Sequence, residues 1–201
     1  MSRIILASAS PRRRELLGIL YPSFEVIPSG ADENVTAQEP AALVEELSRL
    51  KATDIFEKQD HKEDALVIGA DTVVAFEGEI LGKPQGSQHA FRMLEKLQGN
   101  THQVYTGVTL CTLQAGQPMI RTFHECTEVT FYTLTPEEIW EYIESGEPMD
   151  KAGSYAIQGA FAKYVKGIRG DYYNVVGLPV SRLNQELKKM RAEIYEKGSN
   201  L

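Results

Sequence analysis

The sequence predicts an α/β fold in which helices flank a mixed sheet, formed by a single domain over residues 1–201. Short apolar runs, which are typical of strands, interleave with segments whose apolar residues recur at helical spacing. Two long alternating runs, residues 103–113 and 119–134, flank a Gly-containing turn and predict an antiparallel hairpin. Interleaved strands and helices combined with such a hairpin require a sheet of mixed strand direction.

The first twenty residues predict a strand, a turn and a helix. An apolar run at residues 4–7 is followed by Ser10, a favourable N-cap, and by Pro11, whose fixed φ suits the first helical position. Pro11 also has no N–H to leave unsatisfied at that position. The helix is therefore expected to begin at Pro11.

Three arginines, Arg12 to Arg14, occupy the first turn of this helix. This is the positive end of the helix dipole, where each cation is unfavourable by about 0.3–1 kcal/mol. The arrangement is explained if an anion such as a polyphosphate binds there to backbone N–H groups, serine hydroxyls and guanidinium groups. Helical spacing places Arg12 and Arg13 near the sheet-facing side and Arg14 toward solvent. The alternative is a solvated basic patch that follows a serine cap.

Residues 40–58 predict an amphipathic helix, because Leu43, Leu47 and Leu50 step at helical spacing among charged residues. Lys51 is adjacent to this apolar stripe rather than opposite it. Its long stem can either reach toward a cleft or leave the ammonium group in solvent.

An acidic residue interrupts the apolar segment at residues 65–76, which predicts a buried strand. Carboxylates are rarely fully buried unless they are paired or bound to a cation, so Asp71 is a candidate functional residue rather than a capping acid. The preceding Gly69 and Ala70 leave room for a ligand or another backbone to approach.

The remaining segments complete the pattern. Residues 147–159 are polar, contain glycine and lack periodicity, which is typical of loops that carry sites. Further strands are predicted at residues 24–28, 79–81, 161–168 and 172–177, and further helices at residues 87–97, 136–145 and 179–197.

Composition narrows the classes of function. The net charge of −7 argues against a general nucleic-acid binder. No apolar run reaches the roughly 20 residues that span a bilayer, and the N-terminus has no signal-peptide pattern, so we expect a cytoplasmic protein that does not bind membranes. Cys111 and Cys126 form no C-x-x-C pair and are expected to be reduced. Any metal is expected to be a hard cation held by carboxylates and phosphate.

Five motifs, in the order SASPRRRELL, GADTVV, LGKP, EPMDKAGSYAIQG and YYNVVGLPV, resemble the Maf family of nucleoside triphosphate pyrophosphatases. The resemblance implies an elongated α/β fold like that of inosine triphosphate pyrophosphatases, with two lobes flanking a central cleft, and a homodimer. It also implies hydrolysis of a nucleoside triphosphate to the monophosphate and pyrophosphate with a divalent metal, Mg²⁺ or Mn²⁺. The EPMDKAG…IQG form is similar to the branch that acts on dTTP and UTP.

The resemblance also implies roles for individual residues. Asp71 matches the residue that accepts a proton, and Glu33 is a second candidate metal ligand beside it. The positions linked to substrate choice match Arg12, Thr72 and Gln158. The polar lining of the cleft matches Ser8, Arg13, Glu33, Lys51 and Lys83. The family usually has KAGAYGIQG, whereas this chain has Ser154 and Ala156; a positive φ at position 156 would be unfavourable for alanine.

The chemistry of these residues agrees with that reaction. Attack of water on the α-phosphorus needs a carboxylate, and Asp71 can act as a base or hold a metal that activates the water. Cations must stabilise the departing pyrophosphate. The side-chain amide of Gln158 can donate to a carbonyl oxygen and accept from the N3–H of uracil or thymine. Alternatively, Gln158 only ties down its loop.

Three other functions are alternatives to this one. A non-catalytic nucleotide-binding regulator of septum formation would need the arginines but not the acids. A pyrophosphatase for another modified nucleotide would share the chemistry and differ at the base pocket. Nucleic-acid binding through Arg12 to Arg14 is disfavoured because no aromatic residues are interleaved with the arginines.

Overall fold

The computed structural model describes residues 3–198. Its strands are β1 (Arg3–Leu6), β2 (Glu25–Val26), β3 (Ala65–Phe76), β4 (Glu79–Leu81), β5 (Thr101–Gln114), β6 (Gln117–Phe131) and β7 (Val165–Arg169). Its α-helices are α1 (Pro11–Gly18), α2 (Pro40–Glu57), α3 (Ser87–Leu97), α4 (Pro136–Glu144), α5 (Tyr172–Val176) and α6 (Val180–Gly198). Four 3₁₀ helices complete the described residues: η1 (Lys62–Asp64), η2 (Glu147–Asp150), η3 (Ala152–Ser154) and η4 (Ala160–Tyr164).

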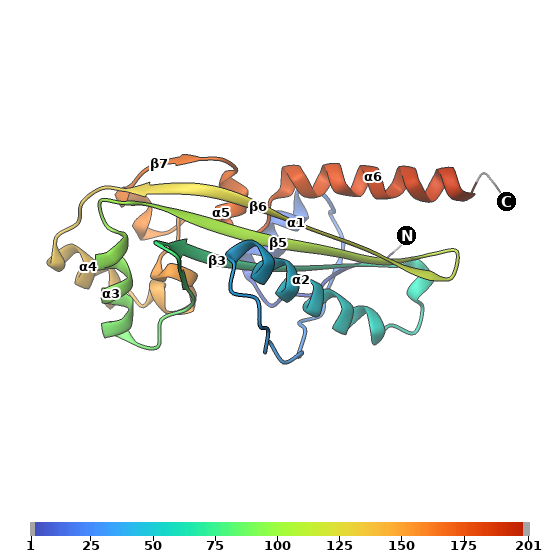
Figure 1. The fold of residues 1–201 in the computed structure, drawn as a ribbon, viewed down its shortest axis with the longest axis horizontal. Helices are drawn as coiled ribbons and strands as arrows, with labels where there is room; N and C mark the ends of the chain where they lie inside the picture. The colour runs from blue at the N-terminus through green and yellow to red at the C-terminus, as the bar shows by residue number, and fades with distance from the viewer. Residues whose placement is uncertain (1–2, 199–201) are drawn as a thin grey trace. The chain divides into compact units, whose positions relative to one another are not determined.

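The strands form one mixed sheet, as the sequence predicts (Figure 1). Their order is β2-β1-β3-β5-β6-β7, and β4 pairs with β3 beside this path. Strand β1 runs parallel to both β2 and β3, whereas β4 is antiparallel to β3 and β7 is antiparallel to β6. The fold class is therefore confirmed: α/β, with helices flanking a mixed sheet.

The chain divides into two compact units. Unit 1 comprises Met1–Asp71, Thr106–Glu125 and Gly177–Leu201, and unit 2 comprises Thr72–Tyr105 and Cys126–Val176. The division falls within β3, β5 and β6, each of which contributes residues to both units. A central cleft stays a prediction from the resemblance.

In unit 1, helix α2 packs on β3 and β5 at two glycines. A Cβ atom on Gly69 would lie 2.4 Å from the Ser48 carbonyl oxygen, and one on Gly107 would lie 2.1 Å from the Val44 carbonyl oxygen. The helix backbone therefore contacts the sheet directly, as the small residues before Asp71 predict.

The buried face of α2 differs from the predicted stripe, because only Leu47 of the three predicted leucines is buried. Leu43 and Leu50 are partly exposed. The residues buried against the sheet are Val44, Leu47, Ser48, Ala52, Ile55 and Phe56. The glycine contacts rotate the helix so that its small residues face the sheet.

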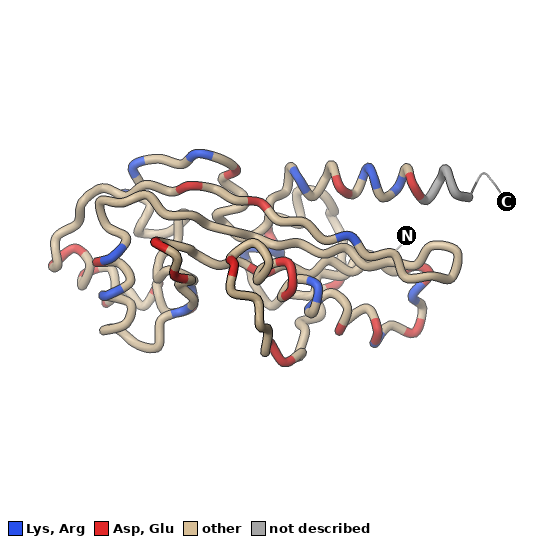
Figure 2. Tube along the Cα trace, in the orientation of Figure 1, with Lys and Arg blue, Asp and Glu red and all other residues tan. Residues whose placement is uncertain are grey.

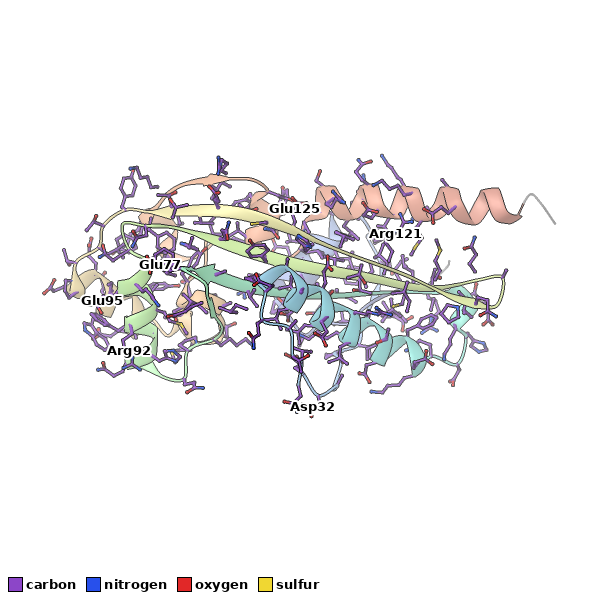
Figure 3. All side chains as sticks on the ribbon, viewed as in Figure 1. Asp32, Glu77, Arg92, Glu95, Arg121 and Glu125 are labelled. Atoms are coloured by element: carbon purple, nitrogen blue, oxygen red, sulfur yellow. The ribbon has the colours of Figure 1, made fainter. Side chains whose placement is uncertain are left out.

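Helix α6 covers the opposite face of the unit 1 strands (Figure 1). Both basic and acidic residues occur along it (Figure 2), and Arg121 of β6 lies beside it (Figure 3). Arg121 donates to Glu186 at 3.2 Å and also pairs with Glu193. Burial by itself raises the pKa of Glu186, but a hydrogen bond from Lys189 and the nearby arginines lower it below its ordinary value. Ion pairs therefore join α6 to β6.

The core of unit 2 is aromatic. The His102 ring lies edge-on to Phe131 and Tyr155, with ring centroids 4.6 and 5.3 Å apart, and its Nε2 hydrogen-bonds the Tyr155 hydroxyl at 2.8 Å. On the helical side, Phe91 of α3 stacks on Trp140 of α4 with ring centroids 4.9 Å apart. Such pairs contribute roughly 0.5–1.5 kcal/mol beyond the area that they bury.

Local signals predicted several boundaries correctly. Thr135 and Glu138 form the expected capping box at the start of α4. Ala115 and Gly116, with φ of 48° and 75°, form the two-residue turn of the hairpin between β5 and β6.

The predicted strand at residues 172–177 is wrong, because this segment forms helix α5. The Asp171 carboxylate accepts from the Tyr173 N–H at 2.8 Å, which satisfies a backbone donor in the first turn. The buried Asn174 side chain donates to the Val104 carbonyl oxygen and to Thr127, each at 2.9 Å. These long-range contacts override the strand preference of tyrosine and valine.

Two other predicted strands are shorter than expected. The first half of residues 161–168 forms η4, in which Phe161 and Tyr164 are both buried at the three-residue spacing of a 3₁₀ helix. Strand β7 begins only at Val165. The strand predicted at residues 24–28 pairs only over β2, since proline on each side limits it.

The hydropathy of the helices and the state of the cysteines bear on the expectations from composition. None of the helices within residues 3–198 combines the length and the apolar character that a membrane span needs. Cys111 is buried, Cys126 is partly buried, and neither is part of a disulfide within the described residues, in line with the prediction.

Candidate active site

Helix α1 begins where the sequence predicts. Ser10 is the N-cap, and its hydroxyl accepts from the Arg13 backbone N–H at 3.4 Å. Pro11 occupies the first helical position, and Leu16 and Leu17 are buried. Arg14 is exposed, whereas Arg12 and Arg13 are partly buried, as their helical positions predict.

The Arg13 side chain joins three segments of unit 1. Its Nε donates to the Gly177 carbonyl oxygen at 2.9 Å, and its Nη1 donates to the Ala70 carbonyl oxygen at 2.8 Å and to the Ser8 hydroxyl at 3.2 Å. Ser8 is buried, and its hydroxyl also accepts from the Ser10 N–H at 3.3 Å. Arg13 therefore fixes the start of α1 to the residue that precedes Asp71.

A lysine bridges two carboxylates at the end of this arrangement. Lys51 Nζ lies 2.6 Å from Asp71 Oδ1 and 3.0 Å from Glu33 Oε1. The side chains of Lys51 and Asp71 are each 14% exposed, whereas that of Glu33 is 56% exposed. The sequence left open whether the Lys51 ammonium group reaches toward a cleft or stays in solvent; in the structure it is largely buried and pairs with Asp71.

The close packing of α2 explains why this pair forms. Side chains two residues apart on a strand lie on the same face, so Asp71 shares the face of Gly69, on which α2 rests. Ala52, whose backbone nitrogen would lie 2.7 Å from a Cβ on Gly69, directly follows Lys51. The glycine therefore brings the helix close enough for Lys51 to reach Asp71.

The charges of these residues act on one another. Burial lowers the pKa of the Arg13 guanidinium, the negative charges of Asp71 and Glu33 oppose this effect, and the positive charge of Arg12 adds to it. Two arginines and two carboxylates thus share one electrostatic environment, to which Lys51 is joined by its ion pairs.

The structure brings together part of the predicted site. Unit 1 holds the residues joined by the contacts above: Ser8, Arg12, Arg13, Glu33, Lys51 and Asp71. Unit 2 holds Thr72, Lys83 and Gln158. Thr72 follows Asp71 directly in β3, and Lys83 is exposed between β4 and α3.

Gln158 lies at an exposed turn between η3 and η4. No hydrogen bond joins its side chain to the rest of residues 3–198, so other groups hold this loop. The positive φ in the loop falls on Gly153 and Ser154, at 67° and 62°, and not on Ala156. Alanine at position 156 therefore adds no strain of that kind.

Two groups that shape the site are not predicted by the sequence. The carbonyl oxygens of Gly177 and Ala70 orient Arg13, and a backbone carbonyl has no signature in the residue type. The residue type at position 177 was a usable signal, because glycine readily adopts a positive φ and other residues rarely do. In the structure Gly177 has φ of 123°.

A family model described as Maf-like protein matches residues 3–190 of this chain. The chain belongs to the Maf family. Three Maf relatives named dTTP/UTP pyrophosphatase align over almost their whole length. The one from Agathobacter rectalis is 54% identical over 96% of this chain and 100% of its own, and the one from Lachnoclostridium phytofermentans is 47% identical over 98% and 99%. The one from Bacillus cereus strain AH187 is 48% identical over 96% and 98%.

The solved structure of the Staphylococcus aureus Ham1 protein also aligns with this Maf chain. The alignment covers 81% of this chain and 90% of that chain, with a TM-score of 0.48 and 15% sequence identity. The α/β assignment stands on the strands and helices described above.

Proposed function

We propose that this protein hydrolyses dTTP and UTP to the nucleoside monophosphate and pyrophosphate, by attack of water on the α-phosphorus. The Maf relatives that carry the name dTTP/UTP pyrophosphatase support this substrate class. The observation that carries the chemistry is Lys51 held between Asp71 and Glu33, beside Arg12 and Arg13. An anhydride hydrolase needs this combination of acids and cations.

Asp71 is the proposed base. Its Oδ1 accepts a hydrogen bond from Lys51, and its second carboxylate oxygen has lone pairs that can accept the proton of a water. Lys51 holds the carboxylate in one orientation. Arg12 and Lys83 are the proposed cations for the triphosphate. Arg13 supports Arg12 by fixing the helix that carries both arginines.

The proposed cofactor is Mg²⁺ or Mn²⁺. The described residues contain no cluster of three or more His, Cys, Asp or Glu side chains that would enclose a metal. Mg²⁺ is usually bound by one or two carboxylates, with phosphate and water oxygens as its other ligands, so Asp71 and Glu33 fit such an ion. When bound, the ion would offset phosphate charge and acidify a water. Lys51 would then keep the two carboxylates close together.

Gln158 and Thr72 are the proposed base-recognition residues. The Gln158 amide is exposed and is not used by its own loop, which leaves it available for the N3–H and a carbonyl oxygen of uracil or thymine. A site built to hydrogen-bond one base edge rejects a base that leaves its groups unpaired.

We also propose a homodimer in the cytosol. The homodimer follows from the family resemblance, and the cytosol is where free nucleoside triphosphates are synthesised and consumed. Light scattering of the purified protein tests the first part, and a mass of one chain would contradict it.

A turnover screen tests the reaction. The protein is incubated with dTTP, UTP, CTP, ATP and GTP plus Mg²⁺ or Mn²⁺, and pyrophosphate and phosphate are measured separately. We expect pyrophosphate release, with dTTP and UTP cleaved much faster than the others, and we expect Gln158→Ala to reduce this preference. Equal rates on purine and pyrimidine nucleotides would refute the base pocket. Nucleotide binding without turnover would favour the non-catalytic regulator.

A further inference from the structure

The turn that carries Gln158 is held at both ends by two side chains from outside it. The Tyr142 hydroxyl of α4 accepts from the Ala156 N–H at 3.2 Å. The Glu147 carboxylate of η2 accepts from the Ala160 N–H at 3.0 Å through Oε2. The same carboxylate accepts from the Tyr142 hydroxyl at 3.2 Å through Oε1. One connected group therefore binds the backbone two residues before Gln158 and two residues after it.

Gly159 makes room for this arrangement. A Cβ atom at this position would lie 1.7 Å from Glu147 Oε1 and 2.4 Å from its Cδ. Its φ of −98° is accessible to any residue, so the glycine is needed for space rather than for backbone conformation. The Glu147 carboxylate thus lies directly against the backbone next to Gln158.

The surroundings of the two side chains make them rigid. Tyr142 is 4% exposed, and its ring packs on Phe161 with centroids 4.9 Å apart. Glu147 is partly buried, and its backbone carbonyl accepts from Lys151 Nζ at 2.7 Å. No basic side chain pairs with the Glu147 carboxylate among the described residues. Its oxygens serve the turn and the tyrosine.

We propose that Glu147, together with Tyr142, positions Gln158 for recognition of the pyrimidine base. This inference rests on the proposed function and adds a positioning residue that does not itself touch the substrate. Because the carboxylate acts as a hydrogen-bond acceptor, its shape matters more than its charge. A glutamine could still accept from the Ala160 N–H with its oxygen, but its nitrogen cannot accept from the Tyr142 hydroxyl, so it keeps one of the two bonds.

Kinetics with UTP and CTP test the proposal. We expect Glu147→Ala to raise the KM for UTP about tenfold, to leave kcat within about threefold, and to reduce the preference for UTP over CTP. Glu147→Gln, which keeps the bond to Ala160 and loses the one from Tyr142, should lie between the parent protein and Glu147→Ala in all three quantities. A metal ligand or a base would behave differently, because the amide would then be as damaging as alanine. Glu128→Ala, which removes an exposed ion pair with Arg169 in the same unit, is the matched control.

The glycine provides a second, independent test. Gly159→Ala should reproduce the effect of Glu147→Ala, because the methyl group displaces the carboxylate. The double variant should be no worse than Gly159→Ala alone, since the two changes disrupt the same contact. Additive losses, an unchanged UTP preference in Glu147→Ala, or equal damage by Glu147→Gln and Glu147→Ala would each overturn the proposal.

Hydrogen exchange separates this proposal from the proposed function. In the ligand-free protein, Glu147→Ala should speed exchange of the Ala160 and Ala156 amides about tenfold and leave the Tyr132 amide, which bonds the Tyr164 carbonyl, unchanged. If the parent protein cleaves no UTP, the proposed function fails and exchange still decides whether Glu147 holds the turn. Unchanged exchange at both amides refutes the positioning role.

Discussion

Lys51 Nζ lies 2.6 Å from Asp71 Oδ1, although 20 residues separate the two in the chain. The helix that carries Lys51 reaches the strand that carries Asp71 because Gly69 lets the two backbones touch. The pair is only slightly exposed, so its attraction is less weakened by solvent than that of a surface pair. The packing of α2 on Gly69 in unit 1 therefore decides the surroundings of the proposed catalytic carboxylate.

The first prediction concerns the carboxylate. Asp71→Asn keeps the shape of the side chain but can neither accept a proton from water nor neutralise a metal, so turnover should fall by about 10²–10⁴-fold or more. Pyrophosphate release measures the loss, and circular dichroism checks that the fold is retained. Asp32→Asn, at an exposed loop acid, is the control and should leave turnover unchanged. Full activity in Asp71→Asn would rule out the mechanism.

The second prediction concerns the guanidinium group of Arg13. Lysine has a single side-chain nitrogen and cannot donate to Gly177, Ala70 and Ser8 in the geometry of the guanidinium. Arg13→Lys should therefore lower the free energy of unfolding by about 2 kcal/mol, and it should also reduce kcat/KM. Urea unfolding and steady-state kinetics measure the two effects. Arg14→Lys, on the exposed side of the same helix, should change neither. If the two variants behave alike, Arg13 does not fix the site.

The third prediction concerns the contact between α2 and β3. Gly69→Ala places a methyl group against helix backbone atoms that have no room to move aside, so the free energy of unfolding should fall by about 3 kcal/mol. Activity should fall in the molecules that remain folded, because Lys51 moves away from Asp71. Gly167→Ala, in strand β7 with open space around its Cβ position, is the matched control. Equal unfolding midpoints for both variants would contradict this account of the packing.

The fourth prediction concerns pH. Burial lowers the pKa of His102 to about 3, whereas an unfolded histidine titrates near 6.5, so between these values only the unfolded chain binds the proton. Stability is therefore present above pH 6.5 and is lost as the pH falls, at up to about 1.4 kcal/mol per pH unit, or roughly 2 kcal/mol by pH 5. Urea unfolding between pH 7 and pH 4 measures the slope.

Two variants isolate the contribution of this histidine. His102→Gln removes the titrating group and should flatten the slope by about one proton. His61→Gln, at an exposed histidine, should leave it unchanged. An unaltered pH dependence in His102→Gln would assign the acid sensitivity to other groups.

Local signals in the sequence were sufficient for much of the fold. Ser10 and Pro11 begin α1, Thr135 and Glu138 cap α4, and the turn residues Ala115 and Gly116 mark the hairpin. Each depends on short-range sterics or on hydrogen bonds between residues a few positions apart. The order of five motifs along the chain was likewise enough to indicate the Maf family.

The contacts of the site depended on tertiary packing. The residue types of Lys51 and Asp71 were known from the sequence, but two placements of Lys51 remained open until α2 was seen against Gly69. Arg13 and its acceptor Gly177 are 164 positions apart. The strand expected at residues 172–177 became α5 because Asn174 is buried against Val104 and Thr127. Such contacts are decided by which surfaces pack together over long chain separations, and residue periodicity carries no record of that choice.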